Sequence, residues 1–266
     1  MYYSVFSLYL SLIDILFVMH DKIYYNDKIS TIYSLFGFLK PTLCYIYAPT
    51  SPMYNHIVSK FHFTIQHINL YTDIDTQLEE NSLVIFSNPN DIDGQYYDIE
   101  KLIEIWINKN ITIIIDESFL KFTVQQSMKK YLIEYKNIYI ISSIKYFYSK
   151  YNSDITFLLS SISNIDKINN NEKITPLSNC NKTILKSIKE DKSYDKVQRV
   201  LNITKKEKVY RVLELDQNIQ NIFDSSTNQI LVESTKQVNK STFYNIDNTK
   251  EVKFLDTSYR IISLVY

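Results

Sequence analysis

Short apolar runs alternate with amphipathic segments along the first 161 residues of the chain. Apolar runs of strand length predict strands at 21–27, 42–48, 64–71, 82–90, 111–116, 137–143 and 154–161. Apolar residues at helical spacing predict helices over 6–19, 29–40, 96–110 and about 124–135. Strands that alternate with amphipathic helices are typical of a largely parallel sheet covered on both faces. The pattern therefore predicts an α/β fold.

The sequence changes character after residue 161. An Asn- and Lys-rich helical region, 162–204, is followed by short apolar runs that predict strands at 209–215, 229–235 and 259–266. Acidic residues are mixed into the Asn- and Lys-rich region, which favours a solvated helix face over a nucleic-acid patch. We expect a smaller α+β part here and divide the chain into domains 1–161 and 162–266.

The composition indicates a globular, neutral protein. The 266 residues are 45% apolar, enough to bury a core, and 29 basic residues balance 29 acidic ones. A chain with no net charge has no overall field to attract nucleic acid or an anionic membrane, so we expect neither partner. The two cysteines, Cys44 and Cys180, match no zinc or redox spacing, which is typical of the cytoplasm.

Residues 1–20 are apolar enough to suggest a membrane or signal segment. They lack a basic start and a small-residue cleavage site, and Asp14 interrupts them. We therefore expect a packed helix rather than a membrane segment.

Glycine is scarce, since Gly37 and Gly94 are the only two in the chain. Backbone positions that need a positive φ must then be filled by Asn, Asp or Ser.

Polar residues follow three of the predicted strands, as SNPN at 87–90, DES at 116–118 and SSIK at 142–145. Ligands of open α/β sheets bind beyond the carboxyl ends of the strands, so chemistry is expected there. The P-loop and the dinucleotide fingerprint both need closely spaced glycines, which this chain lacks. Its four histidines match no metal motif, so we expect no metal ligands.

Asp116 and Lys145 stand at the ends of two predicted strands, 29 positions apart. A carboxylate beside a pyridine nitrogen and a lysine that holds an aldehyde are the arrangement that makes pyridoxal 5'-phosphate an electron sink. The same residues also fit a simpler interpretation, in which the lysine is exposed and the acidic pair caps a helix. Their spacing alone leaves both interpretations open.

Three segments resemble a known family: LVIFSNPNDIDG (83–94), IIIDESFLKF (113–122) and NIYIISSIKYF (137–147). Their order and spacing are similar to the N-P-N-N-P-T-G, D-E-[AS]-[FY]-x-x-F and S-L-[ST]-K motifs of fold-type I aminotransferases, especially the histidinol-phosphate aminotransferase and threonine-phosphate decarboxylase group. FLKPTLCYIYAPTSPMY (38–54) resembles a further segment of that group. The resemblance covers about residues 20–160. It implies a three-layer large domain that binds pyridoxal phosphate, followed by a reduced C-terminal domain.

The resemblance also implies residue roles. Lys145 matches the lysine that holds the cofactor aldehyde, and Asp116 matches the partner of the ring nitrogen. Ser142 matches a phosphate ligand. Arg260 resembles the arginine that binds the substrate carboxylate, for which a guanidinium is suited.

Several positions depart from the family pattern. Asp91 replaces the asparagine that bonds the phenolic oxygen of the cofactor, and an ionised carboxylate there would repel a phenolate. The phosphate cradle at a helix N-terminus falls on Asn26 and Asp27, where Asn26 permits a turn but Asp27 opposes an anion. Ser51 replaces the ring-stacking aromatic, and Ser153 replaces the arginine that grips the phosphate.

These residues lead to two hypotheses on function. In the first, the chain is a divergent pyridoxal-phosphate-dependent aminotransferase of amino-acid metabolism, or a related decarboxylase, that acts on an amino acid and a 2-oxo acid. In the second, it is a degenerate relative that retains the fold as a non-enzymatic binding or structural module. The resemblance also implies a homodimer.

Overall fold

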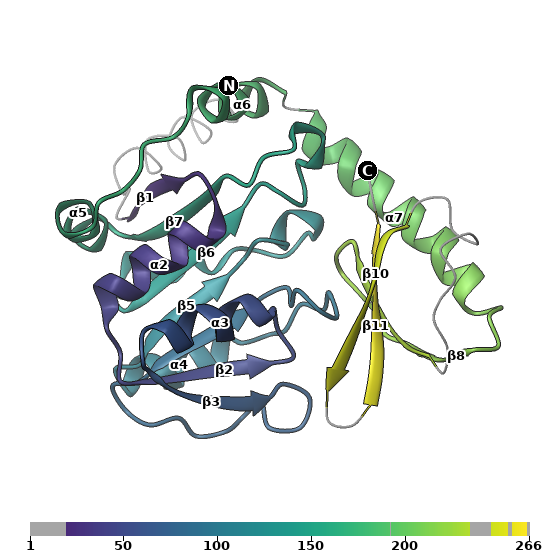
Figure 1. The fold of residues 1–266 in the computed structure, drawn as a ribbon, viewed down its shortest axis with the longest axis horizontal. Coiled ribbons are helices and arrows are strands. Elements are labelled where there is room, and N and C mark those ends of the chain that lie inside the picture. Colours follow the sequence, from purple (N-terminus) through teal and green to yellow (C-terminus); the bar gives the residue numbers. More distant parts are fainter. Residues whose placement is uncertain (1–19, 192, 235–245, 255–256, 265–266) are drawn as a thin grey trace, which may run out of the picture.

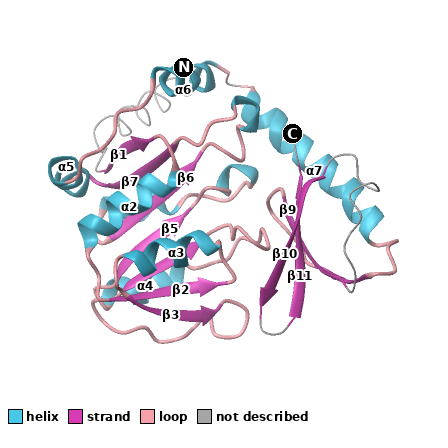
Figure 2. Ribbon diagram, viewed as in Figure 1, coloured by secondary structure: helices cyan, strands magenta, loops and turns pink. Residues whose placement is uncertain are grey.

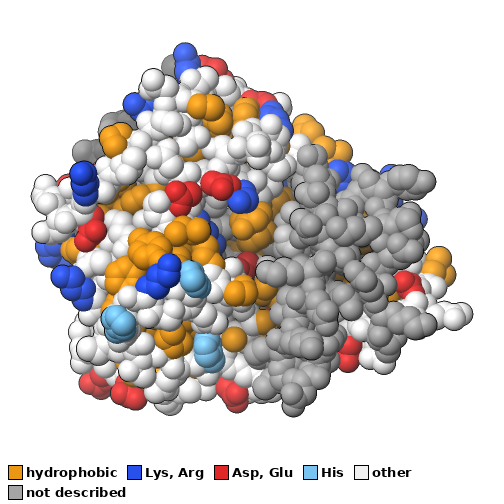
Figure 3. Space-filling view, in the orientation of Figure 1, with side chains coloured by type: hydrophobic (Ala, Val, Ile, Leu, Met, Phe, Trp, Pro, Cys, Tyr) orange, Lys and Arg blue, Asp and Glu red, His pale blue; other side chains and the backbone are white. Residues whose placement is uncertain are grey.

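The computed structural model describes residues 20–191, 193–234, 246–254 and 257–264. The predicted helix over 6–19 lies outside these ranges. Within them, no helix combines the length and the apolar character needed to cross a membrane. Acidic and basic side chains are interspersed over the face shown in Figure 3.

A seven-stranded sheet with the order β1-β7-β6-β5-β4-β2-β3 forms the centre of the larger part (Figure 1). The five strands from β6 to β3 run parallel; β7 pairs antiparallel with β6, and β1 pairs antiparallel with β7 at the edge. This confirms the predicted α/β class with a largely parallel sheet. The strands are β1 (His20–Tyr25), β2 (Leu43–Ala48), β3 (Thr64–Asn69), β4 (Leu83–Ser87), β5 (Thr112–Asp116), β6 (Ile138–Ser143) and β7 (Thr156–Ser161).

Helices cover both faces of this sheet (Figure 2). Side chains from α2 (Lys28–Leu39), α3 (Pro52–Lys60) and α5 (Ile162–Asn171) share one core with Cys44 and Ile46 of β2. The next side chains along the same strand, Tyr45 and Tyr47, point to the opposite core, which α4 (Glu100–Asn108) and the 3-10 helix η2 (Met128–Ile133) complete. This alternation along one strand explains why the strand is apolar throughout.

The chain then forms α6 (Asn179–Glu190), the long helix α7 (Tyr194–Leu213) and a four-stranded antiparallel sheet of order β10-β11-β9-β8. Its strands are β8 (Ile219–Ile222), β9 (Gln229–Ser234), β10 (Ile246–Phe254) and β11 (Thr257–Leu264). A smaller α+β part therefore follows the large sheet. The domain division at residue 162 stays a prediction, and α5 just beyond it packs on the large sheet through Ile165 and Ile168.

Two predicted elements were wrong. The α-helix predicted at about 124–135 is only the short 3-10 helix η2. The strand predicted at 209–215 is the end of α7, because Val209 and Leu213, four residues apart, pack together against Ile230 and Val232 of β9. An apolar pair at that spacing lies on one face of a helix.

Parallel pairing brings the carboxyl ends of β2, β4, β5 and β6 to one edge of the sheet. The register places Ser87 beside Asp116 and Asp116 beside Ile141. The residues that follow these strands are therefore neighbours in space, as expected for a ligand site of an open α/β sheet.

Candidate functional site

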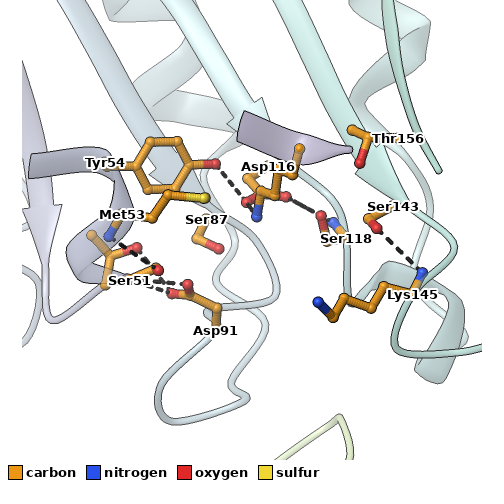
Figure 4. A network of polar contacts seen from close by, with 12 residues as sticks. Ser51, Met53, Tyr54, Ser87, Asp91, Asp116, Ser118, Ser143, Lys145 and Thr156 are labelled. Carbon is orange, nitrogen blue, oxygen red and sulfur yellow. Dashed lines mark hydrogen bonds and ion pairs between the residues drawn. The ribbon is translucent and has the colours of Figure 1, made fainter. Parts of the chain in front are cut away.

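Asp116 ends β5 and is nearly inaccessible to solvent, with 1% of its surface exposed. Its Oδ1 accepts hydrogen bonds from the Ser118 backbone N–H (3.0 Å) and the Ser118 hydroxyl (2.5 Å). Its Oδ2 accepts one from the Tyr54 hydroxyl (2.5 Å) and forms an ion pair with the Lys28 ammonium. Figure 4 shows Tyr54 and Ser118 directed at Asp116 from opposite sides. All the acceptor positions of this carboxylate are engaged within the protein.

Lys28 is the first residue of α2, and Tyr54 lies on α3, the helix beside it. Burial alone would raise the pKa of Asp116, but the Lys28 ammonium and the hydrogen bonds hold it below its usual value. Burial alone would lower the pKa of Lys28. The charge of Asp116, its hydrogen bond and the nearby Tyr146 and Asp91 together more than offset this, so the pKa is raised. The buried pair is therefore ionised at neutral pH.

Lys145 lies two residues beyond the end of β6, the strand next to Asp116. Its backbone N–H donates to the Ser143 hydroxyl (3.2 Å). Its ammonium forms an ion pair with Asp154 (2.8 Å), and both side chains are about half exposed. The hydrogen bond to Asp154 raises the pKa of Lys145, so this amine stays protonated at neutral pH. The two residues singled out from the sequence thus lie at neighbouring strand ends, each with a different charged partner.

Asp91 follows β4 and faces the same edge. Its carboxylate accepts hydrogen bonds from the Thr50 hydroxyl (2.9 Å) and the Ser51 backbone N–H (3.1 Å). Burial raises its pKa to about 6, although the positive charge of Lys28 acts in the opposite direction. The carboxylate therefore connects the loop after β4 to the start of α3.

Asn26 and Asp27 lie between β1 and α2. Asp27 caps α2, since its carboxylate accepts from the Ser30 backbone N–H (2.7 Å) and hydroxyl (2.8 Å). The Asn26 amide oxygen accepts from the Ser178 N–H (3.1 Å) and so ties this turn to the segment before α6. The N-terminus of α2 thus already holds a carboxylate from the protein itself.

The remaining candidates lie further along the chain. Ser142 is half-buried on β6, opposite Phe157 of β7. The Ser153 hydroxyl donates to the Asn181 side chain (3.0 Å). Arg260 lies on β11, where its backbone pairs with Val232 of β9, and its side chain lies outside the described part of the structure.

The sequence motifs do not include three residues of the site: Lys28, Tyr54 and Tyr146. Tyr146 stacks on Phe119, with ring centroids 4.3 Å apart, and its electrostatic interactions with Lys28 and Asp116 place it in the same site. One signal pointed to Lys28: a cation in the first turn of a helix opposes the helix dipole, so it suggests a nearby carboxylate. No local pattern indicates that this carboxylate is Asp116, 88 residues away.

The ring end of the site does not fit pyridoxal phosphate in the way that the family resemblance implies. The carboxylate that would bind the ring nitrogen, Asp116, has its acceptor positions filled by Lys28, Tyr54 and Ser118. A bound ring N–H would have to displace one of these donors.

The phosphate end does not fit either. Asp27 places a carboxylate at the helix N-terminus that would hold a phosphate, and Ser153 stands where the resemblance implies an arginine. Among the described residues, no group of three or more His, Cys, Asp or Glu side chains is arranged to hold a metal ion.

Similarity to known proteins covers much of the chain. Residues 26–163 match a model of the family "Aminotransferase class I and II". Histidinol-phosphate aminotransferase of Flavobacterium johnsoniae is 25% identical over 194 residues, which is 69% of this chain and 55% of that protein. The enzyme of the same name from Clostridium beijerinckii is 37% identical over 89 residues, 32% of this chain and 25% of that protein. The matches thus span at most about half the length of these two relatives.

Solved structures share the fold. L-threonine-O-3-phosphate decarboxylase from Porphyromonas gingivalis has a TM-score of 0.78 at 15% identity, over 92% of this chain and 78% of that one. Histidinol-phosphate aminotransferase from Clostridium acetobutylicum has a TM-score of 0.76 at 16% identity, over 93% and 79%. Since the family match covers more than half of its residues, the chain belongs to the aminotransferase class I and II family.

Proposed function

We propose that this chain is a non-enzymatic member of its family, which retains the fold as a binding or structural module. One observation carries the proposal: the carboxylate and the amine that the family chemistry would need are both paired with other protein charges. Asp116 is paired with Lys28, and Lys145 with Asp154.

The two pairs differ in strength. Lys145 and Asp154 are exposed to water, and such pairs contribute little, so Lys145 alone is readily released. Lys28 and Asp116 are buried, with 12% and 1% of their side chains exposed. Breaking a buried ion pair by removing one partner costs about 3–5 kcal/mol. The obstacle to cofactor binding is therefore at Asp116.

Absorption spectroscopy tests this proposal. The purified chain is titrated with pyridoxal 5'-phosphate, and the visible band of lysine-bound cofactor is followed, with Lys145→Ala as the control. We expect the wild type and the control to give the same weak signal, because only surface lysines react. A saturable wild-type band, lost in Lys145→Ala and located on Lys145 by borohydride reduction and peptide mass spectrometry, would refute the proposal.

A divergent aminotransferase is the second candidate, and one observation favours it. Asp116 ends β5, and Lys145 lies two residues beyond the end of the adjacent parallel strand β6, which supports the roles that the family resemblance implies for them. In this candidate the protein acts on an amino acid and a 2-oxo acid, or decarboxylates an amino acid, and Arg260 orients the substrate. The saturable band described above, with conversion of an amino donor, would establish it. A homodimer and a cytoplasmic location are expected for either candidate.

A further inference from the structure

Lys28 is an unusual residue for its position. It begins α2, where the helix dipole disfavours a cation, and its side chain is 12% exposed. A buried ammonium is stable only with a carboxylate partner, which Asp116 supplies. The Lys28 nitrogen also lies 5.4 Å from the centroid of the Tyr54 ring, a favourable cation–π contact. Asp116 and Tyr54 thus fix this lysine inside the site.

The Lys28 ammonium offers the same chemistry as a protonated ring nitrogen. Each is a cationic N–H donor, and a carboxylate oxygen accepts from either in the same way. Because Ser118 and Tyr54 fill the other acceptor positions of Asp116, the Lys28 position is the one at which a cationic donor from a ligand would bind.

We propose that Lys28 is a built-in cation that occupies the ring-nitrogen position of the site and thereby excludes cationic heteroaromatic ligands. The inference rests on the proposed non-enzymatic function and names the residue that closes the site. It implies that replacing Lys28 with a neutral residue opens Asp116 to a ring that carries an N–H cation.

Titration of three proteins with pyridoxal tests this: the wild type, Lys28→Met and Lys60→Met. Pyridoxal lacks the phosphate, so the altered phosphate end does not affect the result. Lys60 lies at the end of α3, its ammonium over the Tyr33 ring, and serves as the matched control. We expect Lys28→Met to bind about tenfold to hundredfold more tightly than the wild type, because no charged hydrogen bond must be displaced. Lys60→Met should behave as the wild type.

The gain must depend on Asp116. In the double variant Lys28→Met/Asp116→Asn, we expect the affinity to return to the wild-type level. A folded Lys28→Met that binds pyridoxal no better than the wild type would overturn the inference, as would a gain that persists in the double variant.

Two further measurements allow for a Lys28→Met that fails to fold. Lys28→Gln still donates a hydrogen bond to Asp116 without the charge, and it should also bind more tightly than the wild type. In the wild type, amine acetylation followed by peptide mass spectrometry should label Lys28 much more slowly than Lys60. Equal labelling rates would show that Lys28 is not held in the site and would overturn the inference.

The inference and the proposed function fail in different ways. Saturable binding of pyridoxal phosphate to wild-type Lys145 refutes the non-enzymatic function. A Lys28→Met protein that binds pyridoxal no better than the wild type, while the wild type shows no saturable band with pyridoxal phosphate, leaves that function in place and refutes only the role of Lys28.

Discussion

At the scale of single residues, Asp91 makes stability depend on pH. Burial raises its folded pKa to about 6, above the value of about 3.9 for an unfolded chain. A carboxyl group with a raised folded pKa holds its proton more tightly in the native state. Its contribution to stability is therefore greatest below pH 4, is lost as the pH rises from about 4 to about 6, and stays lost above that.

Replacing Asp91 with Asn should remove this cost. We expect Asp91→Asn to raise the free energy of unfolding by about 1–2 kcal/mol at pH 8 and to change it little at pH 4. Urea unfolding at the two pH values measures this, with Asp166→Asn, an exposed position on α5, as the control. The same effect at both pH values would contradict the assignment.

The hydrogen bond from the Tyr54 hydroxyl to Asp116 can be removed by deleting one oxygen atom. Tyr54→Phe removes the hydroxyl that donates to Asp116 but keeps the buried ring. A hydrogen bond to a charged group contributes about 1.5–3 kcal/mol, and we expect the free energy of unfolding to fall by that amount. Tyr33→Phe, at a half-buried ring on α2, should change it by less than about 0.5 kcal/mol. Equal effects of the two variants in urea unfolding would show that the bond is unimportant.

The scarcity of glycine has the predicted consequence. Asn81, Asn110 and Asn152 all adopt positive φ angles, between 44° and 59°, because asparagine tolerates this region better than other residues with a Cβ atom. Lys40 and His62 do the same, although neither is an Asn, Asp or Ser. At Lys40 the reason is the end of α2, where its N–H bonds to Phe36 and closes the last turn.

At the scale of elements, the strands of the large sheet were predicted well because most of them contain a short apolar run between polar turns, as in LVIFS of β4 and TIIID of β5. The segment 124–135 was predicted wrongly as an α-helix because its conformation is set at its start by a side chain outside the segment. The buried Glu117 carboxylate accepts from the Ser127 hydroxyl (2.6 Å) and the Met128 N–H (2.7 Å), which fixes the chain at the start of η2. The hydrophobic pattern within the segment does not indicate such a contact.

One of the two glycines of the chain, Gly94, lies where a side chain does not fit. Its φ is +71°, and an added Cβ would lie 2.1 Å from the Ser225 hydroxyl and 2.6 Å from that of Thr227. Its carbonyl oxygen accepts from the Ser226 N–H (2.8 Å), so the loop after β4 contacts the loop before β9 here. We expect Gly94→Ala to lower the free energy of unfolding by about 2 kcal/mol or more.

Gly37 is the matched control, because it lies inside α2. The atom nearest to its added Cβ would be a carboxylate oxygen of Glu172, at 3.2 Å, and that flexible group can move. Alanine is favoured over glycine within a helix by about 1 kcal/mol, so Gly37→Ala should stabilise the protein. Urea unfolding compares the two variants, and hydrogen exchange at the Ser226 amide reports the loop contact. Effects of the same sign would refute this account.

At the scale of the whole molecule, the site forms from segments far apart in the sequence. The motifs that end β4, β5 and β6 could be located because strand ends of a parallel sheet meet at one edge. Lys28 could not, because its position depends on α2 packing beside α3 over Asp116, which is a property of the assembled layers. The ion pair of Lys28 with Asp116 is thus the part of the site that sequence motifs do not contain.

The helix α7 joins the two sheets (Figure 1). Near its start, Asp195 accepts hydrogen bonds from the Lys121 ammonium (2.5 Å) and the Tyr148 hydroxyl (2.6 Å), both from the larger part. Near its end, Val209 and Leu213 pack against β9. Asp195 therefore fixes the position of the helix that carries the smaller sheet.

Asp195→Ala should loosen this connection. Burial alone would raise the pKa of Asp195, but the Lys121 and Tyr148 hydrogen bonds hold it below its usual value, so its contribution is present above about pH 4 and is lost on acidification. Because the group is partly exposed, we expect a loss of only about 1 kcal/mol at pH 7, with a smaller loss at pH 3. Urea unfolding measures it, and Glu207→Ala, at an exposed position of the same helix, is the control. Hydrogen exchange should also become faster in β9, because the helix α7 on which this strand packs is held less firmly. The substitution itself removes no contact of β9. If only the residues around Lys121 and Tyr148 respond, α7 does not transmit the change to the smaller sheet.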